Sequence, residues 1–163
     1  MRIYGTSIAA LLLFCMTGMG YAQTCNDSIQ AATPDSRFEV TGDEVTDLQT
    51  GLIWQRCSVG QSWDGSSCSG TATIHTWAQA LALASGNWRL PNIKELTSIV
   101  ETSCVNPAIN VSVFPNTLSH FYWSSSPYAY ASYQAWNVSF YYGTAYAYVK
   151  YLSRYVRLVR GGQ

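Results

Sequence analysis

The first part of the chain alternates apolar and polar side chains, which is the period of short β-strands. Within residues 37–56, Phe38 and Val40 alternate with polar neighbours, and a Thr-Gly-Asp turn follows at 41–43. The apolar run at 52–54 comes after a second turn signal, Thr-Gly. Because short strands are joined by glycine-containing turns, this segment predicts a hairpin-like group of strands.

From Thr76 the period changes to that of a helix. Trp77, Leu81 and Ala84 recur at helical spacing and predict the side that faces the core. Thr76 is a favourable N-cap, and Gly86 stands just past the last turn. We therefore predict a helix between Thr76 and Gly86.

A second helix is predicted to begin after Asn92. Asn92 can cap it, and Glu95 stands three residues on, as in a capping box. Ile93, Leu96 and Val100 supply the buried stripe.

Beyond Cys104 the helical period disappears, and strand-like segments separated by turn residues take its place. The predicted strands are 122–124, 136–140, 146–151 and 156–159. In the second of them Trp136, Val138 and Phe140 alternate with polar residues and predict the side that faces the core. Helices followed by antiparallel strands predict an α+β domain, with two short helices packed on the sheet.

The amino-terminal residues have the layout of a secretory signal peptide. A basic start is followed by an apolar run at 8–14 and by small residues that end at Ala22. The run is far shorter than the roughly 20 apolar residues that span a bilayer, so we expect no membrane span. Residues 1–22 are therefore predicted to be a signal peptide and residues 23–163 a single secreted domain, in the periplasm, at the cell surface or outside the cell.

Without the signal peptide the chain keeps an even number of cysteines: Cys25, Cys57, Cys68 and Cys104. They form no Cys-x-x-Cys pair, and an oxidising compartment favours two disulfides over a zinc site. Three connectivities are possible. We favour Cys57–Cys68, which closes a short Gly/Ser-rich loop, with Cys25–Cys104, which ties down the N-terminus. No metal is expected.

The acidic side chains offer no arrangement that suits catalysis. All nine lie between Asp27 and Glu101. We interpret Glu95 as a helix cap and Glu101 as solvated helix surface. No nucleophile with a base and an orienting acid emerges, since His75 precedes the first helix and His120 lies in a loop. We therefore predict a protein that is not an enzyme and needs no cofactor.

Tyrosine is concentrated in the last part of the chain. Ten of the twelve tyrosines lie between Tyr122 and Tyr155. Together they exceed what one small core can bury, and tyrosine with Ser, Gly and Asn is the residue choice of antibody paratopes. We therefore predict an exposed ligand-binding face formed by Tyr128, Tyr130, Tyr133, Tyr141, Tyr142, Tyr146, Tyr148, Lys150 and Tyr151.

Six segments stand out in order along the secreted chain. They are TGLIWQRC at 50–57, WRLPNIKEL at 88–96, FP at 114–115, WSS at 123–125, AW at 135–136 and VRLVRGG at 156–162. Together they resemble the Lcl C-terminal domain family. The resemblance implies a C-type-lectin-like fold, related to the formylglycine-generating-enzyme group.

The resemblance also implies classes of function. Some Lcl-type domains sit on bacterial surfaces and bind sulfated glycans. Some lectin-fold proteins of this group are variable targets of diversity-generating retroelements, whose changing residues precede a constant end. Residues 126–151, followed by 155–162, resemble that arrangement. Trp136-Asn137 is similar to the Trp-Asn-Asp run of calcium-binding lectins, but Val138 replaces the aspartate, so we expect no calcium site there.

Three functions remain open. The first is a secreted or surface recognition module that binds a protein or glycan ligand through the tyrosine-rich face, diversified or not. The second is a binder of fixed specificity for sulfated or acidic glycans, which would use Lys150, Arg154, Arg157 and Arg160. The third is a non-catalytic structural protein of the envelope. No nucleic-acid partner is predicted.

Overall fold

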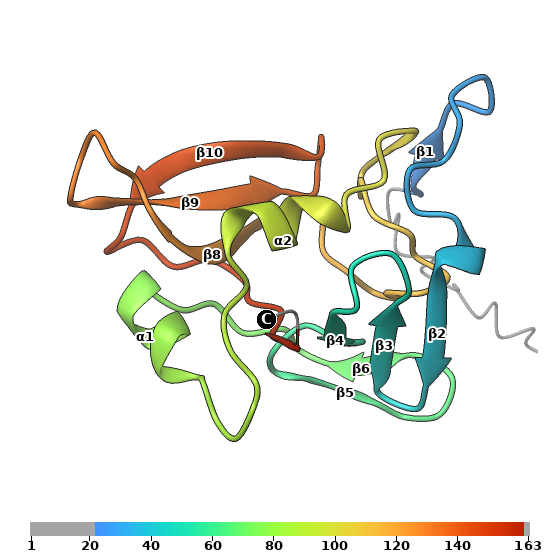
Figure 1. The fold of residues 1–163 in the computed structure, drawn as a ribbon, viewed down its shortest axis with the longest axis horizontal. Helices are drawn as coiled ribbons and strands as arrows, with labels where there is room; N and C mark the ends of the chain where they lie inside the picture. The colour runs from blue at the N-terminus through green and yellow to red at the C-terminus, as the bar shows by residue number, and fades with distance from the viewer. Residues whose placement is uncertain (1–21, 162–163) are drawn as a thin grey trace, which may run out of the picture.

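A computed structural model describes residues 22–161, which form two main antiparallel sheets, two two-stranded pairs and two short helices (Figure 1). The predicted α+β class is confirmed. The predicted signal peptide, residues 1–22, lies outside the described residues apart from Ala22. Within residues 22–161 no helix is long and apolar enough to cross a membrane.

One main sheet joins the early strands to the last strand of the chain. Its order is β11-β4-β3-β2, with β2 at Phe38–Thr41, β3 at Glu44–Asp47, β4 at Ile53–Gln55 and β11 at Val159–Arg160. Val45, Trp54 and Val159 are aligned across three strands and are fully buried. The predicted hairpin is confirmed. Of the strand predicted at 156–159, only Val159 pairs in the sheet.

The other main sheet carries Tyr146 and Tyr148 of the predicted tyrosine face, and the rest of that face lies in its turns and just beyond its last strand. Its order is β10-β9-β8, with β8 at Phe121–Pro127, β9 at Gln134–Ser139 and β10 at Thr144–Val149. The strand predicted at 146–151 therefore begins and ends two residues earlier. The chain turns after Val149, whose carbonyl accepts a hydrogen bond from the Leu152 N–H, and this turn leaves Lys150 and Tyr151 beyond the strand.

The middle strand, β9, is buried on both sides. Tyr122, Val138 and Ala145 are in register on the side that contributes to the main core. On the other side Asn137 is also fully buried. Trp136, predicted to face the core with Val138, is only half-buried, because it lies toward the end of the sheet that the main core does not reach.

The first helix, α1 (Trp77–Ala82), is shorter than its apolar pattern predicts. Thr76 caps it as predicted, in a capping box with Gln79. The helix ends at Ala82, so Ala84 lies beyond it and is exposed instead of joining the predicted stripe. The buried residue of the helix is Ala80, whose methyl group allows α1 to approach β8 closely.

The second helix, α2 (Ile93–Ser98), begins as predicted. Asn92 and Glu95 form the capping box, and Leu96 is fully buried. Val100 is buried but follows the end of the helix. The helix lies against β8 and β9, on the core side of their sheet (Figure 1).

Two pairs of very short strands lie beside the disulfides. β1 (Thr24–Cys25) pairs with β7 (Cys104–Val105), and β5 (Gln61–Trp63) pairs with β6 (Cys68–Gly70). The structure contains the Cys25–Cys104 and Cys57–Cys68 bonds, so the predicted connectivity is confirmed. The sequence does not predict these strands, because two or three residues are too few to show an alternation.

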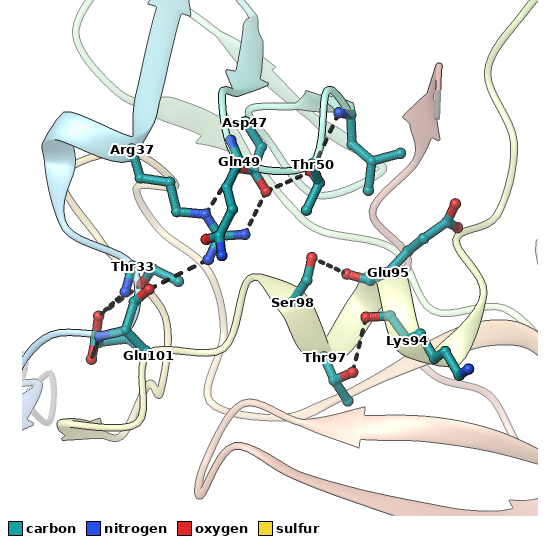
Figure 2. Close-up of polar contacts among 12 residues, drawn as sticks. Thr33, Arg37, Asp47, Gln49, Thr50, Lys94, Glu95, Thr97, Ser98 and Glu101 are labelled. Atoms are coloured by element: carbon teal, nitrogen blue, oxygen red, sulfur yellow. Dashed lines mark hydrogen bonds and ion pairs between the residues drawn. The ribbon is translucent and has the colours of Figure 1, made fainter. Parts of the chain in front are cut away.

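A buried carboxylate holds the N-terminal segment to the end of α2 (Figure 2). Glu101 accepts hydrogen bonds from the N–H groups of Ala32 and Thr33, from the Thr33 hydroxyl, and from the N–H and hydroxyl of Ser103. Burial alone would raise the pKa of Glu101, but these hydrogen bonds outweigh it and lower the pKa to about 2. The prediction of a solvated Glu101 is wrong, because only 3% of it is exposed.

A second carboxylate fixes the short 3₁₀ turn η1 (Asp35–Arg37). The Nε and Nη2 atoms of Arg37 donate to the two oxygens of Asp47, at 2.8 and 2.5 Å (Figure 2). Asp47 also accepts from the Thr50 hydroxyl. The N-terminal segment is therefore anchored before η1 by Glu101 and at the last residue of η1 by Asp47.

Candidate ligand-recognition face

Most of the clustered tyrosines are exposed. Tyr122 is fully buried, and Tyr128 and Tyr155 are half-buried. The exposed ones, with the exposed fraction of each, are Tyr130 (90%), Tyr133 (63%), Tyr141 (41%), Tyr142 (65%), Tyr146 (43%), Tyr148 (45%) and Tyr151 (74%). Aromatic rings contribute most to folding stability when they are buried. Core packing therefore does not explain this many exposed rings in one stretch of the chain.

The predicted tyrosines do not form one continuous cluster. Tyr128 and Tyr130 follow β8, and their ring centroids lie 5.5 Å apart. Tyr128 also packs edge-on against Trp136, at 5.1 Å. Trp136 is on the core side of β9, whereas Tyr146 and Tyr148 are on the opposite side of the sheet, in register with Asn137 and Ala135. Tyr128 and Tyr130, which we call the β8–β9 loop group, are therefore separate from the tyrosines on β10.

The second group forms what we call the aromatic face: Phe121, Tyr146, Tyr148 and Arg154. Tyr146 packs edge-on against Phe121, with centroids 6.0 Å apart. The guanidinium carbon of Arg154 lies 4.9 Å from the Phe121 centroid and 4.7 Å from that of Tyr148. Because Phe121 is on β8 and Tyr148 on β10, Arg154 bridges both outer strands of the sheet.

Next to the aromatic face is a hollow of about 370 Å³. We call it the aromatic hollow, and its lining residues are Ser119, His120, Phe121, Ser139, Tyr141, Tyr142 and Tyr146. Tyr141 and Tyr142 belong to the turn between β9 and β10, and their rings meet edge-on at 4.4 Å. The hollow therefore has one wall from the sheet and one from this turn.

The turn that carries Tyr141 and Tyr142 is held by backbone hydrogen bonds. The Asn106 N–H donates to the Tyr141 carbonyl at 2.9 Å, and the Ala108 N–H donates to the carbonyl of Phe140, whose ring is fully buried. Gly143 closes the turn with a φ of +73°, and an added Cβ would lie 2.5 Å from Val100 Cγ1. Only glycine meets both demands without strain, so the two tyrosines stand on a fixed base.

The charges around the hollow are few and positive. Burial lowers the pKa of His120, and the nearby Arg154 lowers it further, which favours the neutral imidazole. Burial also lowers the pKa of Arg154. Arg154 Nε and Asn137 Oδ1 are buried and have no hydrogen-bond partner among the described residues. No carboxylate lines the hollow.

Lys150, Tyr133 and Tyr151 lie at the other end of β10. The Lys150 ammonium donates to the Ser132 carbonyl at 2.7 Å and lies 4.3 Å from the Trp77 ring centroid. Its charge is therefore engaged within the protein, while Tyr133 and Tyr151 are exposed beside it.

Two of the four basic residues considered for acidic glycans are engaged elsewhere. Arg157 is fully buried and donates to the carbonyls of Gln55 and Arg56. Arg160 pairs with Glu44 at 2.6 Å. Arg157 is unavailable to a ligand at the surface, because its side chain is fully buried.

Five residues of the site were not among the predicted ligand-binding residues: Ser119, His120, Phe121, Ser139 and Arg154. Arg154 entered the sequence argument only as one of several late basic residues. No sequence signal places His120 and Phe121 beside Tyr146, because β8 and β10 are separated by a whole strand and two turns. Their proximity follows from the sheet order.

Residues 43–160 match the Lcl C-terminal domain family. The chain belongs to this family. The matched region of this Lcl C-terminal domain includes both helices, the Cys57–Cys68 bond and every residue of the aromatic hollow, whereas β1 and β2 precede it. Among curated proteins no relative is found. Within residues 22–161 no group of three or more His, Cys, Asp or Glu side chains could hold a metal ion.

Proposed function

We propose that this Lcl C-terminal domain is a non-catalytic recognition module with a C-type-lectin-like fold, which binds a protein or glycan ligand outside the cytoplasm. The observation that carries the proposal is the exposure of Tyr141, Tyr142, Tyr146 and Tyr148 around a hollow on a rigid sheet. Exposed apolar patches of this kind mark interaction sites. Tyrosine suits such sites because it offers a large contact area at little cost in side-chain entropy.

The location outside the cytoplasm is supported by the two disulfides. Both form in the folded chain between cysteines that are distant in sequence, 79 and 11 residues apart. Stable disulfides are typical of oxidising compartments. The predicted signal peptide gives the same location from an independent feature of the chain.

A non-catalytic role is supported by the chemistry of the site. The groups that line the aromatic hollow are rings, hydroxyls and the neutral imidazole of His120. An enzyme of the hydrolytic type would pair such a histidine with a nucleophile and an orienting acid. All the carboxylates of the chain precede residue 102, and none lines this hollow.

The alternative of an acidic-glycan binder receives less support. Of its four cations, Arg157 is buried, Arg160 is paired with Glu44, and Lys150 is bound to Ser132 and Trp77. Only Arg154 is close to the aromatic hollow. One cation beside several rings favours stacking over charge recognition.

The experiment compares paired variants on the same ligands. The purified protein is applied to a glycan array and to an array of bacterial and host surface proteins, alongside Y141S/Y142S and Y146S/Y148S. The matched control is I29S/L48S, because Ile29 and Leu48 are similarly exposed apolar residues distant in sequence from the tyrosines. Thermal unfolding of each variant accompanies the arrays.

We expect the tyrosine pairs to keep their stability within about 1 kcal/mol of the parent, because surface substitutions cost little. Binding to at least one array ligand should fall tenfold or more in a tyrosine pair and stay unchanged in I29S/L48S. The proposal is wrong if the array signals are the same in all variants. It is also wrong if the tyrosine pairs unfold cooperatively at much lower temperature, because the tyrosines would then be core.

A further inference from the structure

The aromatic hollow presents ring surfaces from three different segments. Phe121 and Tyr146 meet at an interplanar angle of 74°, and so do Tyr141 and Tyr142. His120 stands edge-on to Phe121, with centroids 5.5 Å apart. Rings at such angles offer flat faces on more than one side of the same space. A ligand with flat apolar faces can therefore contact several of them at once.

Polar groups lie between these rings. Hydroxyls of Ser119, Ser139 and the tyrosines line the hollow, together with the His120 imidazole. The Ser139 hydroxyl oxygen accepts a hydrogen bond from the Tyr141 N–H, and only 3% of Ser139 is exposed, so the hydroxyls that a ligand can reach are those of Ser119 and the tyrosines. A purely apolar side chain of a partner protein would remove these groups from water without replacing their hydrogen bonds. The lining thus favours a ligand that carries hydroxyl groups at its edge.

The charges disfavour a cation and offer an anion no ion pair in the lining itself. None of the lining residues is a carboxylate that could balance a cation, and the nearby Arg154 would repel one. Arg154 lies beside the hollow, over the rings of Phe121 and Tyr148, and is not part of its lining, so an anion inside the hollow would have no direct ionic partner. The volume of about 370 Å³ falls within the roughly 300–1,000 Å³ of small-molecule sites.

The hollow is also rigid in the way that tight sites require. The Phe140 N–H donates to the His120 carbonyl at 2.9 Å, and the Asn106 N–H donates to the Tyr141 carbonyl. These bonds tie the two walls to each other and to the loop before β8. A ligand that enters does not have to order this turn, which is a cost that flexible sites incur on binding.

We propose that the aromatic hollow binds one neutral pyranose ring without calcium, with the sugar's C–H faces stacked on Tyr146, Tyr142 and Phe121 and its hydroxyls bonded to Ser119 and His120. A pyranose unites flat apolar faces with a hydroxyl rim and carries no charge. The inference rests on the proposed recognition function and names the ligand class for the same site.

The test uses neutral methyl glycosides of glucose, galactose, mannose, fucose, N-acetylglucosamine and N-acetylgalactosamine. Each is titrated into the full secreted protein in buffer with EDTA at pH 7, and binding is followed by saturation-transfer NMR. We expect at least one glycoside to bind with a millimolar Kd, which salt hardly changes because no charge is involved. Saturation should pass from protein aromatic protons to one face of the sugar.

Variants then locate the site. Y146S and Y142S should each weaken binding at least tenfold, whereas Y146F, which keeps the ring, should weaken it only a few-fold. Y130S is the matched control, because Tyr130 is 90% exposed and belongs to the β8–β9 loop group; it should leave the Kd unchanged. Thermal unfolding of each variant confirms that the fold is intact.

The pyranose inference is overturned if no glycoside of the panel binds at tens of millimolar, if Y130S weakens binding as much as Y146S, or if binding needs calcium. Dextran sulfate is titrated in the same way as a charged comparison. The inference is also overturned if dextran sulfate alone binds and salt abolishes its binding. Failure of the pyranose inference can be told apart from failure of the recognition function. If only the pyranose inference is wrong, no glycoside binds, but array binding still depends on Tyr141, Tyr142, Tyr146 or Tyr148.

Discussion

Arg157 Nη2 donates a hydrogen bond to Thr117 Oγ1 at 2.7 Å, inside the protein. Arg157 is fully buried, and the carbonyls of Gln55 and Arg56 accept bonds from its Nη1 atom. Its guanidinium carbon lies 4.8 Å from the Phe114 ring centroid. Among the described residues no carboxylate pairs with it. Burial lowers the pKa of Arg157 to about 10. The side chain therefore links the end of β4 to the loop that contains Thr117.

Replacing Arg157 should lower the free energy of unfolding. Arg157→Met keeps much of the side-chain volume but leaves the carbonyls of Gln55 and Arg56 and the Thr117 hydroxyl without the donors that Arg157 supplies. We expect a loss of about 2–4 kcal/mol in the free energy of unfolding, measured by urea denaturation. Arg160→Met is the control, because its pair with Glu44 is about one-third exposed and should contribute less than about 1 kcal/mol. Equal losses in both variants would contradict the assigned role.

Glu101 should make the fold sensitive to acid. Its folded-state pKa, about 2, lies below the ordinary value of 4.5. The resulting stabilisation is fully present above pH 4.5 and is lost as the pH falls toward 2, by about 3 kcal/mol at most. In urea unfolding, Glu101→Gln should be less stable than the parent at pH 7, with the gap closing by pH 2. Glu39→Gln, at an exposed position, should show no such convergence; a constant gap for Glu101→Gln would refute the assignment.

Gly143 should be far less tolerant of a side chain than a glycine in an open turn. In Gly143→Ala the new Cβ would lie 2.5 Å from Val100 Cγ1 and 3.3 Å from Ala108 Cβ, at a φ of +73°. Gly42→Ala has a similar φ, +59°, and nothing within 4 Å. We expect Gly42→Ala to cost about 1 kcal/mol, for the backbone alone, and Gly143→Ala about 1–3 kcal/mol more. Similar thermal midpoints for the two variants would show that the turn yields to Val100.

The Cys25–Cys104 bond should matter for stability and not for recognition. Non-reducing peptide mapping should find no free thiol among Cys25, Cys57, Cys68 and Cys104. Removing the bond in C25A/C104A should cost roughly 2–5 kcal/mol, a loss typical of small disulfide-bonded domains, because it closes the longer loop and joins β1 to β7. Array binding at a temperature where the variant is folded should equal that of the parent. Lost binding by the folded variant would place the ligand site near the N-terminus.

The helix caps and the disulfides could be predicted because their signals are local or few in number. Asn92 and Glu95 form their capping box within four residues, and four cysteines allow few pairings. The alternation of Tyr146 and Tyr148 with alanine also predicted correctly that both rings are exposed. Each of these features depends on residues close in sequence or on a short list of alternatives.

The remaining features depend on contacts that no local pattern encodes. Arg157 has the same sequence surroundings as a surface arginine of a strand, and only the meeting of residues 55–58 with residue 117 shows that it is buried. Glu101 follows an amphipathic helix, which predicts solvent, yet the N-terminal segment folds over it. The aromatic hollow brings His120, which precedes β8, close to Tyr146 on β10, and the sheet order β10-β9-β8 places only β9 between these two strands.

Along β10 the residues that pack in the core alternate with the residues that are exposed for contact with a ligand. Ala145 packs on the core side, and Ala147 shares that side by alternation, so the core relies on two methyl groups there. The tyrosines between them are on the other side, where both rings are exposed although the fully buried Asn137 and Ala135 lie opposite them in β9. Because exposed positions tolerate substitution at little cost to stability, positions 146 and 148 can change more freely than positions 145 and 147. Descendants of this domain could diverge in what they contact while inheriting the same fold.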